Sequence, residues 1–168
     1  MITVLLIIHG LLAVALLGAI THQALAVCWP AHNPANFVAR FRAVSGPSYT
    51  HAVIILFVIT FILGIVIYPA FRLNVRSYLS DYRLLSAEGA FEIKEHVSVI
   101  ALGLLPYYWF LWRRSAAEAF GNDGSGAAAV TGAQVLARGA VTLLLAVVVW
   151  FNFLVGHILN NIRGLFGA

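Results

Sequence analysis

Four long runs of apolar residues divide the chain, and polar or charged segments separate them. The first run is free of charged residues and includes two histidines. An α-helix rises about 1.5 Å per residue, so about 20 apolar residues cross the roughly 30 Å hydrocarbon layer of a bilayer. The pattern therefore predicts four membrane-spanning helices, over residues 2–27, 49–68, 97–112 and 139–162.

The segments between these runs carry helix-ending and interfacial signals. Pro30 and Pro34 follow the first run, and Pro69 is expected to end the second, because proline cannot continue the hydrogen bonding of a helix. Residues 71–94 alternate charged with apolar positions, which is typical of an amphipathic helix lying at the membrane surface. We expect one such interfacial helix, or two short ones, between the second and third spans.

Composition supports a membrane protein. Hydrophobic residues make up 62% of the 168 residues, charged residues only 10%, and the mean hydropathy is +0.94. A soluble domain carries roughly 25% charged residues. We therefore predict a single all-α domain over residues 1–168, an integral membrane four-helix bundle in contact with the lipid bilayer.

Charge gives further limits. The net charge of +4 comes from basic residues between the apolar runs, where they would contact lipid headgroups. They form no basic stripe interleaved with aromatic residues, so no nucleic-acid partner is expected. Because no Lys or Arg precedes Arg40, the first run is interpreted as a span rather than a secretory signal. We expect a bacterial inner (cytoplasmic) membrane as its location.

Four spans would place both termini on one side of the membrane. We call this side A, and it also holds the segment 71–95; side B holds residues 28–50 and 113–138. The basic residues divide equally between the two sides, so the positive-inside rule does not set the orientation.

Histidines lie inside the predicted spans at two matching depths. His9 and His157 each lie about six residues from the side A end of their spans, and His22 and His51 lie close to side B. An ionisable side chain in hydrocarbon is costly unless it is paired or ligated, so it indicates a functional site.

Paired histidines at two levels are the ligand pattern of two bis-histidine haems, because each b-type iron takes two axial imidazoles from facing helices. Through His9, His22, His51, His157 and its number of spans, the chain resembles small multi-span b-type membrane cytochromes. The resemblance implies a membrane electron-transfer subunit with one or two b haems. It also implies exchange of electrons with quinone and with a partner redox subunit.

Other residues fit this prediction. Three arginines lie where haem propionates could emerge, namely Arg42, Arg72 and Arg163. The single cysteine, Cys28, and the lack of a CxxCH motif exclude a covalently attached c-type haem within this chain. Common hydrolase motifs and a P-loop are also missing from the sequence.

Several alternatives stay open. His9 and His22 are thirteen residues apart, so they point about 140° from each other and would face different neighbouring helices. His96 shares a helix face with Glu92 and could replace His9 or His157 as a ligand. The histidines could instead bind a magnesium tetrapyrrole, make packing contacts or handle protons. The rival function is a cofactor-free accessory subunit of a larger membrane complex.

Overall fold

The protein is all-α over the part of the chain that the computed structural model describes, which is residues 1–28, 37, 46–120 and 132–166. Its elements are α1 (Ile2–Cys28), α3 (Gly46–Phe71), a π-helical turn η1 (Arg72–Arg76), α4 (Ser77–Asp81), α5 (Leu85–Phe120) and α6 (Gly132–Phe166). No strand occurs among these residues. The predicted fold class is therefore confirmed at the level of secondary structure.

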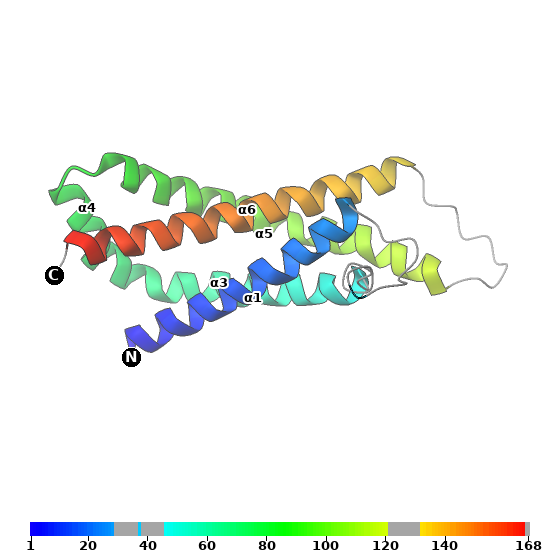
Figure 1. Ribbon diagram of the computed structural model, residues 1–168, viewed down its shortest axis with the longest axis horizontal. Coiled ribbons are helices and arrows are strands. Elements are labelled where there is room, and N and C mark those ends of the chain that lie inside the picture. The colour runs from blue at the N-terminus through cyan, green and yellow to red at the C-terminus, as the bar shows by residue number, and fades with distance from the viewer. Residues whose placement is uncertain (29–36, 38–45, 121–131, 167–168) are drawn as a thin grey trace.

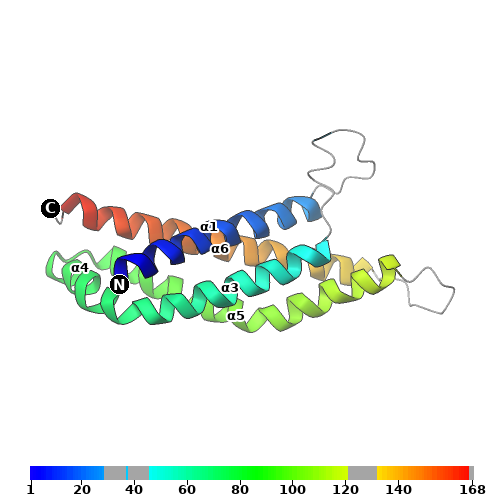
Figure 2. The same cartoon turned by 90° about the horizontal axis from the view of Figure 1, so that it is seen from below.

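The four long helices lie side by side, and each contacts two others. Helix α1 packs against α3 and α6, and α5 packs against the same two helices. Both termini and α4 lie at one end of the molecule (Figures 1 and 2). This end corresponds to side A.

Within the part of the chain that the structure describes, three stretches are long and apolar enough to cross a membrane, namely Ile2–Cys28, Tyr49–Asp81 and Gly132–Asn161. Their length and composition are those of membrane-spanning helices. The predicted span at residues 97–112 lies inside α5, where the apolar stretch is short and includes Pro106, Tyr107 and Tyr108. A fourth crossing by α5 therefore stays a prediction.

The prediction that Pro69 ends the second helix is wrong. Helix α3 runs through Pro69 to Phe71 and continues into η1. Proline lacks the N–H that would bond the carbonyl one turn earlier, and the wider π turn follows directly. Side chains then bond carbonyls in this region: Asn74 Nδ2 donates to the Ala70 oxygen at 2.8 Å, and Ser77 Oγ donates to the Leu73 oxygen at 2.6 Å.

Residues 71–94, which were predicted to form an interfacial segment, belong to several helices. Its first part forms η1 and α4, and residues 85–94 form the beginning of α5. Arg83 adopts a positive φ of 54° in the turn between α4 and α5. Arg76 closes this corner, because its guanidinium contacts Glu88 at 2.7 Å and Glu92 at 3.0 Å.

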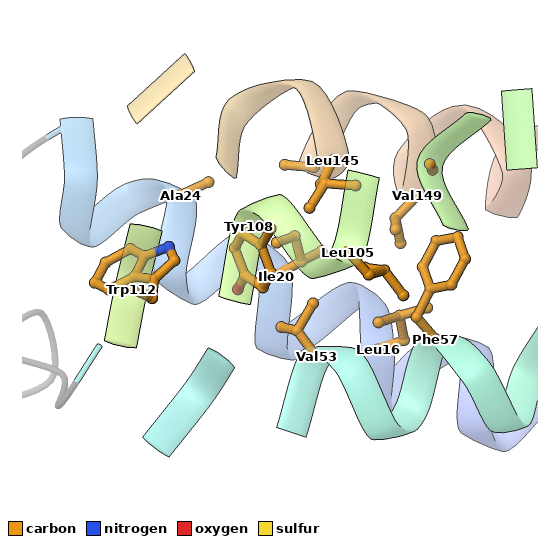
Figure 3. Close-up of a cluster of buried hydrophobic side chains, with 12 residues drawn as sticks. Leu16, Ile20, Ala24, Val53, Phe57, Leu105, Tyr108, Trp112, Leu145 and Val149 are labelled. Carbon is orange, nitrogen blue, oxygen red and sulfur yellow. The ribbon is translucent and has the colours of Figure 1, made fainter. Parts of the chain in front are cut away.

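A cluster of buried apolar side chains, drawn in Figure 3, joins all four long helices. Ile20, Val53, Tyr108 and Leu145 come from the four long helices and are each at most 1% exposed. Helices with apolar residues on all sides can bury such residues anywhere along their length, so side-chain shape selects the contacts.

Hydrogen bonds join the polar side chains within this core. The Tyr108 hydroxyl donates to Gln23 Oε1, and Gln23 Nε2 donates to Thr50 Oγ1 at 3.0 Å. Trp112 Nε1 donates to Thr142 Oγ1 at 3.1 Å. These bonds offset the cost of burying polar atoms, and they link α1, α3, α5 and α6.

Candidate functional site

Five polar side chains from all four long helices gather in the interior towards side A. They are His9 of α1, Thr60 of α3, Lys94 and Ser98 of α5, and Asn152 of α6, and we call them the polar cluster. Asn152 Nδ2 donates to Ser98 Oγ at 2.9 Å, and Ser98 Oγ donates to the Lys94 carbonyl at 2.7 Å. The His9 ring is hydrogen-bonded to the backbone of Thr60, and the charge of Lys94 acts on it.

Two glycines let the cluster side chains lie against the neighbouring backbone. A Cβ atom added to Gly64 would lie 3.6 Å from His9 Cε1, and one added to Gly156 would lie 3.9 Å from Lys94 Cε. Both distances are ordinary van der Waals contacts. The imidazole and the lysine chain therefore occupy the space that larger residues at these positions would need.

Three buried polar atoms of the cluster have no hydrogen-bond partner among the described residues. They are His9 Nδ1, Thr60 Oγ1 and Asn152 Oδ1. Such atoms are uncommon in folded proteins, and each indicates an additional group such as an ordered water or a ligand. Three of them, from α1, α3 and α6, make this cluster a candidate site.

The charged groups at the edge of the cluster are shifted by burial. Burial lowers the pKa of Lys94, and the negative charge of Glu95 partly opposes this shift. Burial raises the pKa of Glu95, while Lys94 and Arg76 lower it. Desolvation disfavours the charged form of each group, so both are closer to neutral than exposed residues would be.

The two histidines predicted to pair near side A lie in different surroundings. His9 is partly buried against α3, whereas His157 is exposed on α6. The His157 ring stacks on Phe153 of its own helix, with the ring centroids 6.3 Å apart. The structure gives these two histidines different neighbours.

The pair predicted near side B is also divided between two environments. The His22 ring stacks on Tyr49 at the beginning of α3, with the centroids 5.0 Å apart. His51 is exposed and lines a groove between α3 and α5.

A bis-histidine haem needs room for its porphyrin between two facing imidazoles. Near the level of His22, buried Gln23, Thr50 and Tyr108 fill the interior. Near the level of His9, the imidazole itself lies close to the backbone at Gly64. A haem at either level would require neighbouring helices to move apart, so ligation by His9, His22, His51 and His157 stays a prediction.

Of the three arginines predicted to contact haem propionates, only the side chain of Arg72 is among the described residues. Arg72 is exposed in η1 at the side A end. Arg42 and the side chain of Arg163 lie outside the described residues. Within the described part of the chain, no group of three or more His, Cys, Asp or Glu residues is placed to hold a metal ion.

His96, the alternative ligand, has a fixed ring orientation. Its Nδ1 lies 2.7 Å from the carbonyl oxygen of Glu92, one turn earlier in α5, and the residue is exposed. The predicted contact with Glu92 therefore uses the backbone, because the carboxylate of Glu92 pairs with Arg76. A neutral ring in this position carries its proton on Nδ1 and leaves Nε2 as an available ligand atom.

The groove between α3 and α5 has a volume of about 540 Å³. It is apolar except for one imidazole, and its lining residues are His51, Ile54, Ile55, Val58, Leu102, Leu105, Pro106 and Trp109. It opens on the outer surface of the helices, where a lipid-soluble molecule could enter.

Sequence reasoning named Asn152 and Thr60 as partners of the intramembrane histidines but missed the role of Lys94 in the polar cluster. A usable signal was present, because Lys94 is the only lysine in the chain and directly precedes an apolar run. Comparison of the chain with known protein families, with curated proteins and with solved structures found no match.

Proposed function

We propose that the chain is an integral membrane subunit of a redox complex, and that the groove between α3 and α5 binds a quinone. The proposal includes α5 as a fourth crossing helix and a partner subunit that exchanges electrons with the quinone. The groove is the observation that carries it.

The chemistry of the groove suits a quinone. Small-molecule sites are mostly apolar, with a few polar groups that orient the ligand. Here the His51 imidazole can donate a hydrogen bond to a quinone carbonyl, and the face of Trp109 can stack on the ring. Ile54, Ile55 and Val58 would contact the isoprenoid tail.

We expect His51→Leu to weaken quinone binding by about 2- to 10-fold, because a net hydrogen bond contributes about 0.5–1.5 kcal/mol. The measurement is quenching of tryptophan fluorescence by a quinone with a decyl side chain, titrated into the protein in lipid nanodiscs. His157→Leu is the matched control, since His157 is also exposed but lies on α6 outside the groove. An equal loss of affinity in both variants, or no saturable binding to the wild type, would refute the quinone site.

Haem binding is a second candidate function, and the orientation of His96 favours it. Metal-ligating histidines usually donate their other ring N–H to a carbonyl or carboxylate, as His96 Nδ1 is placed to do with Glu92. A b haem would supply one-electron transfer. Its iron would be held by His96 Nε2 in place of His157, which is exposed on α6.

For this candidate we expect His96→Ala to remove haem absorbance, whereas His157→Ala retains it. The measurement is a reduced-minus-oxidised spectrum with pyridine haemochrome quantitation on purified protein. Equal haem content in both variants would exclude His96 as the ligand. No Soret band in the wild-type protein or its complex would leave the cofactor-free accessory subunit as the better interpretation, provided that quinone binding also fails.

A further inference from the structure

We propose that the polar cluster is an internal proton-binding site, in which Lys94 and His9 share a proton through ordered water held by Thr60 and Asn152. The inference rests on the hydrogen bonds that run from Asn152 through Ser98 to the Lys94 carbonyl, on the position of Lys94 Cε beside Gly156, and on the three unpaired polar atoms of the cluster. It does not depend on quinone or haem binding.

The choice of cation at this position is informative. Lys94 is the only lysine of the chain, and the other nine basic residues are arginines. An arginine stays protonated in proteins, whereas a lysine amine can lose its proton when it is buried. The chain thus places its only lysine inside the molecule, where the Cε atom of Lys94 lies close to the backbone at Gly156.

The donors and acceptors of the cluster are complementary. Because His9 Nδ1 has no partner, the bond to the Thr60 backbone uses Nε2, which donates to the carbonyl oxygen. In the neutral ring Nδ1 is then an acceptor. Asn152 Nδ2 donates a hydrogen bond to Ser98, and Asn152 Oδ1 is an acceptor without a partner.

An ammonium group has three N–H donors and no acceptor. Charged Lys94 could therefore satisfy the open acceptors of the cluster through ordered water, and these are His9 Nδ1, Asn152 Oδ1 and Thr60 Oγ1. Buried waters typically make two to four hydrogen bonds to such groups. When Lys94 is neutral, its amine lone pair can accept a proton from the protonated His9 ring.

The groups around Lys94 connect the cluster to side A. From α1 the titratable neighbour is His9, and α3 and α6 present Thr60 and Asn152 with their two glycines. On α5 itself Glu95 is adjacent, and it interacts with Glu92, His96 and, from η1, Arg76. Burial lowers the pKa of Lys94, which favours proton release at a lower pH than for an exposed lysine.

The single lysine allows a direct test by NMR. Protein labelled with ε-¹⁵N lysine and placed in lipid nanodiscs gives one side-chain signal, which is followed from about pH 6 to about pH 11. We expect a titration midpoint below the ordinary value of about 10.4, because burial disfavours the ammonium form. A midpoint at the ordinary value would overturn the proposal.

Two variants test the shared proton itself. His9→Phe and Asn152→Leu each remove an acceptor that stabilises the ammonium form, so each should lower the midpoint by about half a unit or more. His157→Phe is the control and should leave it unchanged, because His157 lies exposed on α6. If both cluster variants leave the midpoint unchanged or raise it, Lys94 does not share its proton with these groups. If one of these two cluster variants fails to fold, the other still provides the test.

Discussion

Replacing Tyr108 by alanine is expected to lower the free energy of unfolding by about 3–5 kcal/mol. This is the usual cost of removing a large buried aromatic side chain. Tyr108 is 0% exposed and donates a hydrogen bond to Gln23, which is also 0% exposed. The variant would leave a cavity and would remove the hydrogen bond that Tyr108 donates to buried Gln23.

The measurement is a denaturant or thermal unfolding curve of the purified protein in a fixed detergent, followed by circular dichroism. Tyr107→Ala is the matched control, because Tyr107 is the preceding residue of the same helix and is 48% exposed. It should change stability much less. Equal destabilisation by the two variants would show that α5 is not oriented as described.

The second large effect is expected from Gly139→Leu, which should destabilise the protein by about 1–3 kcal/mol through overpacking. Gly139 lies on α6 where it meets α1, and an added Cβ atom would lie only 3.2 Å from Val27 Cγ1. A leucine side chain would therefore force the two helices apart. Small residues permit such close approach between helices in membranes.

Gly103→Leu on α5 serves as the control, since an added Cβ atom there meets no atom within 4 Å. Unfolding curves recorded under the same conditions should separate the two variants. If Gly139→Leu is as stable as the wild type, the close contact between α1 and α6 is absent in solution.

The apolar pattern predicted the long helices well, because an uncharged run of this length has few alternatives to a helix in a membrane. The expected span at residues 2–27 corresponds to α1 at Ile2–Cys28. Proline was the unreliable signal. Pro69 lies inside α3, and the helix continues past it into η1 although its missing N–H removes one backbone hydrogen bond.

The candidate site shows where sequence reasoning stops. Counting residues along a helix gives the depth of His9 and His157, since each residue advances the helix by a known rise. It does not show which side of a helix with apolar residues on all faces points inward. His157 is five residues after Asn152 and therefore points about 140° away from it, so the packing that buries Asn152 Oδ1 leaves His157 exposed.

Composition and periodicity alone were enough to predict an all-helical membrane protein with uncharged spans and an ionisable group inside them. These properties follow from local requirements, namely hydrogen bonding of the backbone and transfer of apolar residues from water. The rotation of each helix about its axis depends on contacts among residues far apart in the chain. Only the tertiary structure could therefore bring His9, Lys94 and Asn152 into one cluster and leave His51 in a groove.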